Sequence, residues 1–485
     1  NNDVTVTFTA TDNVGNTNTA SYTFYEDNSN PTLSDAMSAY AESGDTDEVY
    51  ELTGSNTFYF SNSFDSAATI TFTATGSDTG LAGVRGIDFG IFGADNPDED
   101  TSTPYTGQYT LNTDDNSGSI TVTIYDNVGN NASGSITCTE DVSSPTISVT
   151  GESESSQYLY SGYGTGIQGV YGSGMGSTQT YTISGTASDT DSDLLSITDD
   201  TSFGDDPSNT GTVTNWVFDY QIDAADNNDV TVTYTATDNV GNTNTVSYTF
   251  YEDNANPTLS DAMSAYVESG DTDEVDGVIA SNVFYFSNSF DSAATITFTA
   301  TGSDTGFAGV RGIDFGTFGI DNPPEDTSTP YTGQYTLNTD DTSGSITVTI
   351  YDNVGNSASD IITCTEDVSN PTISVTGESE GSQYLYSGYG TGTQGVYGSG
   401  MGSTQPYTIS GTASDTGSDL FSITDDTSFG DDPGNTGTVT NWVFDYQIDA
   451  ADNNDVTVTF TATDNVGNTN TASYTFYEDN SNPTL

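Results

Sequence analysis

The sequence is defined first by what it lacks: among its 485 residues there is no lysine and no histidine, and only two arginines. Against these two cations stand 71 aspartates and glutamates. Such a chain has almost nothing with which to neutralise phosphates, so we expect it not to bind nucleic acid. An anionic membrane surface would repel it. The partners that this charge favours are cations.

Long hydrophobic runs are also missing. No apolar stretch approaches the length of a membrane-spanning helix, and no signal peptide is visible. We therefore expect no membrane insertion within this segment.

The missing residue types argue against catalysis as well. Without histidine or lysine there is no nucleophile paired with a base. Paired carboxylates can serve glycoside hydrolysis, but here the acidic clusters stand at predicted turns and most of them recur in every repeat. We expect no enzymatic activity. The absence of lysine also excludes Lys–Asn isopeptide cross-links, so stability must come from packing and ions.

Cysteine is scarce, with Cys138 and Cys364 as its only occurrences. Each stands seven residues before a proline, at the place that an inward-facing phenylalanine takes in the alternate unit, Phe24, Phe250 or Phe476. Two interpretations stay open. The thiols are either buried core side chains or partners in intermolecular disulfides, for which a lone cysteine in a secreted chain is a candidate.

What is present is one motif in five copies: a strand of alternating apolar and threonine residues, the pentapeptide Asp-Asn-Val-Gly-Asn, a second alternating strand and an acidic tail ending in proline. The first copy occupies residues 3–31. Its period of two predicts a half-buried antiparallel hairpin. Gly15 suits a positive φ at the tip, and Asp12 and Asn13 can bond to the local backbone.

The motif reveals a tandem array. Its closing prolines are alternately 114 and 112 residues apart, so two unlike units alternate within a period of 226 residues. Residues 1–226 differ from residues 227–452 at only 25 positions. Each unit is long enough for its own core. The predicted domains are a C-terminal hairpin of a partial domain at 1–30, type A domains at 31–144 and 257–370, and type B domains at 145–256 and 371–485.

The leading hairpin is identical, letter for letter, to residues 453–485. We interpret residues 1–33 as the last two strands of a unit, in a window cut from a longer repeating polypeptide. The alternative is that this hairpin completes another subunit by strand exchange.

Both units have the pattern of an all-β fold. The type A unit opens with a polar stretch to about residue 53 and then has strands near 56–61, 68–74, 82–92, 104–112, 118–125 and 134–139. In the type B unit we expect strands near 146–150, 157–161, 178–187, 194–198, 214–222, 229–237 and 245–251. Short strands separated by frequent turn signals indicate two-sheet antiparallel sandwiches.

Two aromatic stretches of the type B unit need separate interpretations. In the predicted strand 214–222, Trp216, Phe218, Tyr220 and Ile222 share one face, which we interpret as core rather than as a ligand platform. The stretch 157–181 is rich in Gly, Ser and Tyr and forms a long excursion. Its tyrosines either fold back on their own sheet or stack on sugars or a neighbouring chain; they are Tyr158, Tyr160, Tyr163 and Tyr171.

The run TATDNVGNTNTASYTFYEDNSNP, the SDTG turn at 77–80 and the spacing of the hairpins resemble the Ig-like repeats of large bacterial and archaeal surface proteins. The chain is also similar, more loosely, to the calcium-dependent cadherin architecture. This resemblance implies tandem Ig-like β-sandwiches arranged head to tail as a calcium-stiffened rod outside the cell.

An Ig-like topology would gather four acidic or amide-bearing segments at each junction. Two turns of a sandwich lie at the pole where the chain enters, and one turn and the exit segment of the preceding unit lie at the opposite pole of that unit. For the first junction these are Glu26, Asp27, Asn28 and Asn30 with Asp78, Asp126, Asn127 and Asn130. The second junction would gather Asp114, Asp115, Glu140 and Asp141 with Asp189, Asp191, Asp238 and Asn239. The equivalents one period later are Glu252, Asp253, Asp304, Asp352 and Asn353, then Glu366, Asp367, Asp415, Asp464 and Asn465.

Carboxylate and amide oxygens without histidine or thiolate suit a hard cation with six to eight oxygen ligands. Calcium fits best and magnesium less well. The alternative is a solvated acidic surface, as in a chain adapted to high salt. Asp191 is replaced by Gly417 in the second period, so the junctions need not hold equal numbers of ions.

Arg85 and Arg311 both stand in the sequence VRGIDFG. Each either forms a salt bridge with a neighbouring carboxylate or docks onto an acidic patch of an adjacent chain.

Two functions follow from the sequence. The first is a structural segment of a repetitive extracellular surface protein, a stalk or filament whose partners are copies of itself or neighbouring repeats. The alternative is an adhesin module that binds carbohydrate or a partner surface through its Tyr/Gly-rich loops.

Overall fold

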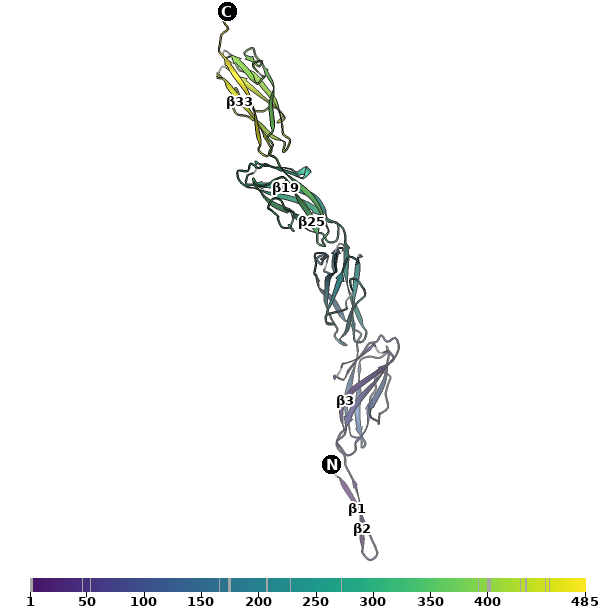
Figure 1. Cartoon of the computed structure of the whole chain (residues 1–485). Helices are drawn as coiled ribbons and strands as arrows, with labels where there is room; N and C mark the ends of the chain where they lie inside the picture. The colour runs from purple at the N-terminus through teal and green to yellow at the C-terminus, as the bar shows by residue number, and fades with distance from the viewer. Residues whose placement is uncertain are drawn as a thin grey trace. The chain divides into compact units, whose positions relative to one another are not determined.

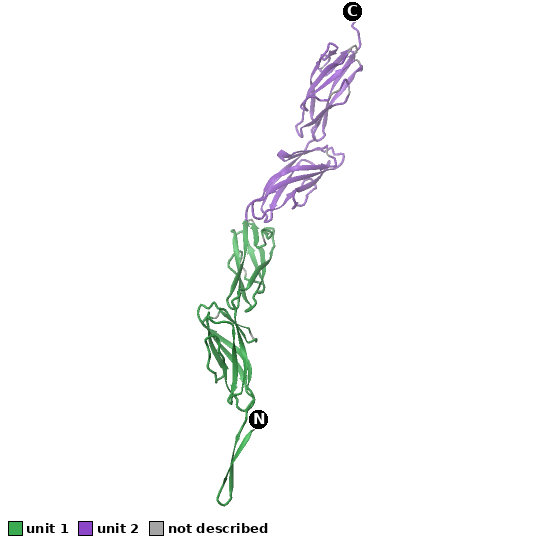
Figure 2. Ribbon diagram, turned by 180° about the vertical axis from the view of Figure 1, so that it is seen from behind, with its two compact units in different colours: residues 1–252 green, residues 253–485 purple. Residues whose placement is uncertain are grey.

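The computed structural model describes all residues except 1, 2, 46, 53, 165, 173–175, 206, 207, 227, 272, 391, 399–402, 428, 432, 433, 450 and 453. The chain divides into two compact units, Asn1–Glu252 and Asp253–Leu485 (Figure 2). Within the described residues, no helix has the length and apolar character needed to span a bilayer.

The first type A sandwich consists of a three-stranded sheet, β3-β6-β8, and a five-stranded sheet, β4-β5-β10-β9-β7 (Figure 1). Strands β5 and β10 pair in parallel, whereas the other pairs are antiparallel. The strands are β3 (Thr32–Ser43), β4 (Val49–Leu52), β5 (Thr57–Phe60), β6 (Ala68–Ser77), β7 (Val84–Phe89), β8 (Tyr105–Leu111), β9 (Gly118–Asp126) and β10 (Asn131–Glu140).

The first type B sandwich repeats this plan with the sheets β11-β14-β16 and β12-β13-β18-β17-β15. Its strands are β11 (Thr146–Glu154), β12 (Leu159–Tyr160), β13 (Gln168–Gly172), β14 (Gln179–Ser188), β15 (Leu194–Asp199), β16 (Asn215–Ile222), β17 (Val230–Asp238) and β18 (Thr243–Asp253).

The second unit contains the same two sandwiches again. Its type A strands are β19 (Thr258–Ser269), β20 (Val275–Val278), β21 (Val283–Phe286), β22 (Ala294–Ser303), β23 (Val310–Phe315), β24 (Tyr331–Leu337), β25 (Gly344–Asp352) and β26 (Ser357–Glu366), with a short 3-10 helix, η1 (Ile279–Ser281). Its type B strands are β27 (Thr372–Glu380), β28 (Leu385–Tyr386), β29 (Gln394–Gly398), β30 (Gln405–Ser414), β31 (Leu420–Asp425), β32 (Asn441–Ile448), β33 (Val456–Asp464) and β34 (Thr469–Asp479).

Each sandwich has its own core between its two sheets. In the first, Ile70 and Phe72 of β6 and Val122 and Ile124 of β9 are buried in one hydrophobic cluster. Alternation along each strand sends these side chains inward and the threonines outward. The predicted all-β, Ig-like sandwich class is therefore confirmed.

The aromatic face of β16 is core, as predicted: Trp216, Phe218, Tyr220 and Ile222 are at most 1% exposed. The Trp216 ring stacks on Tyr234 of the facing sheet, with 4.7 Å between the ring centroids. Buried aromatic pairs of this kind stabilise a core beyond the area that they remove from water.

Three strands were not predicted. The polar stretch at 31–53 contains β3 and β4, and the Tyr-rich excursion contains β13. In β3 the register shifts between Asp35 and Ala39, so the adjacent residues Ala36 and Met37 are both buried. A bulge of this kind destroys the period of two on which the prediction depended.

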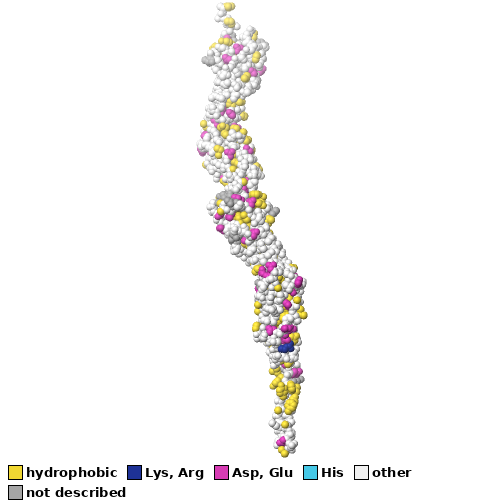
Figure 3. Space-filling model, turned by 90° about the vertical axis from the view of Figure 1, so that its right-hand side faces the viewer, with side chains coloured by type: hydrophobic (Ala, Val, Ile, Leu, Met, Phe, Trp, Pro, Cys, Tyr) yellow, Lys and Arg dark blue, Asp and Glu magenta, His cyan; other side chains and the backbone are white. Residues whose placement is uncertain are grey.

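The leading hairpin of β1 (Val4–Thr11) and β2 (Thr17–Phe24) pairs only with itself in the described chain. Its apolar face is exposed, with Phe8 at 64% and Phe24 at 58%. Figure 3 shows hydrophobic side chains gathered over this hairpin. In the equivalent hairpin β17–β18, Tyr234 and Phe250 are fully buried, so one sequence pattern packs only where facing strands are present.

Cys138 and Cys364 are free thiols in the cores of the two type A sandwiches, each 2% exposed. Burial raises the pKa of both thiols to about 12. The buried-thiol interpretation is confirmed. Burial of both side chains argues against the intermolecular disulfide, which the alkylation and electrophoresis experiments below test.

Replacing Phe250 with Ala tests the packing argument. We expect the free energy of unfolding of the first type B sandwich to fall by about 3–5 kcal/mol, because the substitution leaves a cavity in its core. Denaturant unfolding followed by Trp216 fluorescence, in a chain with Trp442→Phe, measures this loss. Phe24→Ala removes the same residue of the same motif from the exposed hairpin, and it must leave that transition unchanged.

The thiols give a second test. Native protein is expected not to react with iodoacetamide, because the buried cysteines carry almost no thiolate at neutral pH. After denaturation both cysteines should alkylate, as read by mass spectrometry. Fast labelling of the folded chain, or a dimer on non-reducing electrophoresis, would contradict the buried assignment.

Candidate metal centres

The Asp-Asn-Val-Gly-Asn tip fixes the first carboxylate of each candidate centre. In the β9–β10 tip, Asp126 Oδ1 accepts the N–H groups of Val128 at 3.0 Å and Asn130 at 2.8 Å, and Oδ2 accepts Asn130 Nδ2 at 2.8 Å. Gly129 has a φ of 100°, a conformation that suits glycine. Asp126 is thereby fully buried and closes its own turn.

The second motif residue joins this tip to a neighbouring turn. Asn127 Nδ2 donates to the carbonyl oxygen of Ala82 at 2.8 Å, in the turn between β6 and β7. The other sandwiches repeat this bond, from Asn239 to Ser192 at 2.7 Å, Asn353 to Ala308 at 2.8 Å and Asn465 to Ser418 at 2.7 Å. In the sandwiches the amide therefore bonds across two turns, rather than only to the local backbone as predicted.

The segment that enters the sandwich is tied to the same two turns. Asp27 Oδ2 accepts the N–H of Ala82 at 2.7 Å, and its backbone oxygen accepts Asn130 Nδ2 at 3.0 Å. Asp78 accepts the N–H groups of Gly80 at 2.8 Å and Gly83 at 2.9 Å. Three carboxylates from three separate segments are thus held in fixed positions.

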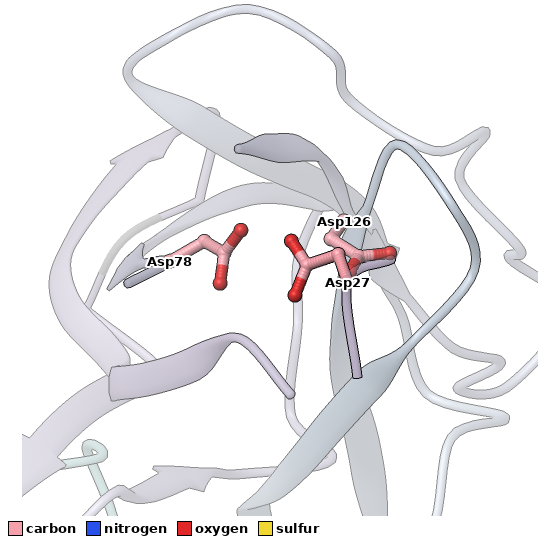
Figure 4. Close-up of side chains that lie close together, drawn as sticks. All are labelled: Asp27, Asp78 and Asp126. Carbon is pink, nitrogen blue, oxygen red and sulfur yellow. The ribbon is translucent and has the colours of Figure 1, made fainter. Parts of the chain in front are cut away.

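These three carboxylates form a triad. Asp27, Asp78 and Asp126 each present one oxygen, and the three oxygens lie within 4.8 Å of one another. Figure 4 shows the carboxylates of Asp27 and Asp78 facing each other, with Asp126 beside them. The predicted convergence of the exit tail and two turns at this pole is what the structure has.

The second sandwich holds an equivalent triad, Asp141, Asp189 and Asp238. Asp141 Oδ2 accepts the N–H of Ser192 at 3.1 Å, and Asn242 Nδ2 donates to the Asp141 carbonyl oxygen at 3.1 Å. In the second unit, Asp253, Asp304 and Asp352 form the same group.

The last sandwich repeats the bonds that build a triad. Asp367 Oδ2 accepts the N–H of Ser418 at 2.8 Å, and its carbonyl oxygen accepts Asn468 Nδ2 at 2.9 Å. Asp415 Oδ2 accepts the N–H of Gly417 at 2.7 Å. Asp464 closes the hairpin tip through Asn468.

The chain has no lysine or histidine to balance the charge of the triads. Burial, opposed by hydrogen bonds from the tip and reinforced by the neighbouring Asp141, raises the pKa of Asp238. The pKa values of Asp352 and Asp464 are raised by the same causes, with Asp253 and Asp367 as the neighbours. Asp304 Oδ2 and Asp415 Oδ1 are buried oxygens that accept no hydrogen bond. Buried carboxylate oxygens of this kind can hold a hard cation.

Several predicted ligands lie outside the triads. Glu26, Asn28, Asn30 and Asp114 are exposed. Asp115 turns into its own loop, where Oδ2 accepts the N–H of Asn112 at 2.9 Å. Asp191 is exposed and accepts a long bond of 3.4 Å from Ser143 Oγ.

The glutamates before each linker donate hydrogen bonds from their backbone N–H groups. The N–H of Glu140 donates to Ser117 Oγ at 2.8 Å, that of Glu366 to Ser343 Oγ at 2.8 Å, and that of Glu252 to Asp229 Oδ1 at 2.9 Å. These bonds join the exit strand to the preceding turn of the same sandwich.

The two arginines are paired within the chain. Arg85 donates to both carboxylate oxygens of Glu99 at 2.9 Å and lies over the Tyr125 ring, 4.6 Å from its centroid. Arg311 repeats this with Glu325 and with Tyr351 at 4.8 Å. The salt-bridge interpretation is confirmed, and the carboxylate that each arginine binds lies outside the triads.

The tyrosines of the excursion are divided between core and surface. Tyr171 is 1% exposed, and its hydroxyl donates to the Asn228 carbonyl at 2.6 Å, so its prediction as an interaction residue is wrong. Tyr163 packs edge-on against Tyr251 at 5.5 Å. Tyr158 and Tyr160 are half-buried. In unit 1 the stretch therefore folds back on its own sheet.

Sequence reasoning missed one kind of acidic group. Asp45, Asp47 and Glu48 also bring three carboxylate oxygens within 4.8 Å, as do Asp271, Asp273 and Glu274. The signal was the sequence GDTDEV, which stands in both type A units. The residue pattern places this sequence in a polar stretch, because it predicts neither of the flanking strands, β3 and β4.

No family model matches the chain, and no curated protein matches it. Similar solved structures include a Ca2+-stabilized adhesin that helps an Antarctic bacterium bind ice. The two sequences are 16% identical, the match covers 89% of this chain and 98% of that chain, and the TM-score is 0.30. The extracellular domain of protocadherin GammaB4 has 12% identity, 99% and 72% coverage and a TM-score of 0.20. The human desmocollin-1 ectodomain has 13% identity, 99% and 86% coverage and a TM-score of 0.21. The fold assignment rests on the sheet topology.

Asn130→Ala tests how the entering segment is held. Loss of the bond to the Asp27 carbonyl should lower the free energy of local unfolding by about 1 kcal/mol, because Asn130 Nδ2 joins the tip to this segment. Faster hydrogen exchange at the amides of Ser29 and Ala82 is the expected result. The matched variant, Asn16→Ala, alters the hairpin tip of β1–β2 and must leave both amides unchanged. Equal exchange in the two variants would contradict the tethering role.

Proposed function

We propose that the chain is a structural segment of a repetitive extracellular protein whose domain junctions bind Ca2+. The observation that carries this proposal is the recurrence of one triad at the entry of successive sandwiches: Asp27, Asp78 and Asp126; Asp141, Asp189 and Asp238; Asp253, Asp304 and Asp352. The domains are proposed to run from 31–144, 145–256, 257–370 and 371–485, after the hairpin at 1–30.

The position of the triads supports a role in stiffening. Each triad takes one carboxylate from the entering segment and two from turns of the sandwich that follows. A cation bound by all three would therefore oppose movement of the segment relative to the sandwich. Without a cation, the three negative charges repel one another across the same joint.

The chemistry of the ligands supports calcium. The triads offer only oxygen, from carboxylates that are held by backbone amides and not by cationic side chains. Extracellular modules with such ligands bind Ca2+ at about 10⁻⁴ to 10⁻³ M. These affinities match a location outside the cell, with copies of the chain or its neighbouring repeats as partners. The recurrence of the same site also favours a scaffold over an enzyme.

Calcium titration tests the proposal. Tenfold excess of Ca2+ over its dissociation constant is expected to add roughly 1.4 kcal/mol per site to the free energy of unfolding. Differential scanning calorimetry should therefore show a higher melting temperature in Ca2+ than in chelator, with a smaller shift in Mg2+. Small-angle X-ray scattering should show a narrower range of chain dimensions in Ca2+.

The controls separate specific binding from an acidic surface adapted to salt. Asp78→Asn with Asp126→Asn removes one triad and must reduce the Ca2+ response, whereas Asp12→Asn, at the same motif position in the hairpin, must not. If NaCl of matched ionic strength stabilises the chain as well as Ca2+ does, or if chelator leaves the melting temperature unchanged, the proposal is refuted.

A further inference from the structure

A second kind of acidic site lies in the loop between β3 and β4 of the type A sandwich. Here Asp45, Asp47 and Glu48 bring one oxygen each within 4.8 Å of the others. The loop is separate in sequence from the entry triad of the same sandwich, whose ligands are Asp27, Asp78 and Asp126. In the second type A sandwich, Asp271, Asp273 and Glu274 form the same group.

One carboxylate of this group is fixed by the sandwich itself. Asp45 Oδ2 accepts the N–H groups of Asp65 at 2.7 Å and Ser66 at 2.9 Å, in the loop before β6. Asp271 Oδ2 accepts the equivalent bonds from Asp291 at 2.7 Å and Ser292 at 3.1 Å. The loop is therefore anchored in the same way in both copies, although the sequences that follow it, residues 50–54 and residues 276–280, differ at all five positions.

Glu48 provides the independent observation. Glu48 is only 9% exposed, and its Oε2 atom is buried and accepts no hydrogen bond. Glu274 Oε2 is unpartnered in the same way. One Glu48 oxygen also lies within 4.8 Å of oxygens of Asp45 and Asp47. A buried carboxylate in such a group is stabilised by a positively charged partner.

The chain itself supplies no such partner. It has no lysine and no histidine, and both arginines are engaged by Glu99 and Glu325. Three carboxylates on a loop, without nitrogen or sulfur ligands, suit a hard divalent cation. Ca2+ accepts irregular oxygen sets, whereas Mg2+ requires near-ideal octahedral geometry.

We propose that each of these two acidic loops binds one Ca2+ ion, at a site distinct from the entry triads. The ligands are Asp45, Asp47 and Glu48 in the first loop and Asp271, Asp273 and Glu274 in the second. The type B sandwich lacks this site, because Ser155, Ser156 and Gln157 follow its first strand where the type A unit has the acidic loop. The two kinds of sandwich therefore differ in the number of ions they bind.

The loop also lies against the sandwich that follows. The carbonyl oxygen of Asp47 is 3.4 Å from the position that a Cβ atom would take on Gly241, in the β17–β18 tip, and that of Asp273 is 3.2 Å from the same position on Gly467. The adjacent tip residues Val240 and Val466 are fully buried. Ordering of the loop by Ca2+ would thus stabilise the contact from a type A to a type B sandwich.

The test compares Ca2+ stoichiometry in two variants of the full chain. Glu48→Gln with Glu274→Gln keeps the side-chain volume and removes the buried charge, so this variant is expected to fold. Glu154→Gln with Glu380→Gln removes the same number of charges from the ends of β11 and β27. Bound Ca2+ is measured by equilibrium dialysis in NaCl of matched ionic strength, and folding by near-ultraviolet circular dichroism.

The expected result is that the first variant binds one ion fewer for each altered loop, while the second binds as many ions as the parent chain. Unchanged stoichiometry in the folded Glu48 and Glu274 variant would overturn the proposal, and would mean that a proton neutralises these carboxylates. Asp45→Asn with Asp271→Asn gives a second test that alters different ligands and must show the same loss. Because the entry triads are untouched, their Ca2+ binding is measured separately by Asp78→Asn with Asp126→Asn.

Discussion

The structure depends on carboxylates that are brought together without positively charged side chains to balance them. Asp126, Asp238, Asp352 and Asp464 are buried at the hairpin tips, where backbone and side-chain amides hold them in place. Amide hydrogen bonds stabilise each carboxylate individually, but they do not cancel the repulsion between neighbouring carboxylates. In the proposed function, a bound cation neutralises the group.

The β-sandwich explains why this convergence is repeated so faithfully. The pairing of long strands fixes the turns at one pole of each sandwich. In the first sandwich, the Asp-Asn-Val-Gly-Asn tip forms hydrogen bonds both to the β6–β7 turn and to the entering segment. Core packing therefore positions the polar groups indirectly.

Much of this arrangement could be predicted from residue patterns. Alternating strands identified the hairpins and the aromatic face of β16, and the Ig-like order of strands placed Asp27, Asp78 and Asp126 at one pole. The pattern failed where the backbone departs from regular pleating: the register shift in β3 places Ala36 and Met37 inward together. Without β3 and β4, the loop holding Glu48 could not be assigned a place in the fold.

Residue type alone also could not separate ligands from structural acids. Asp115 and Asp126 both stand at turns, yet one closes its own loop and the other belongs to a triad. Tyr171 was indistinguishable from its neighbours until β13 placed it in the core. Such distinctions depend on where the backbone amides point, which only the folded chain specifies.

The most direct test of the central claim is anomalous diffraction from crystals grown with Ca2+. The account predicts an anomalous peak between the carboxylates of Asp27, Asp78 and Asp126, and another between those of Asp141, Asp189 and Asp238. Water or empty density at both positions, in crystals with millimolar Ca2+, would contradict it.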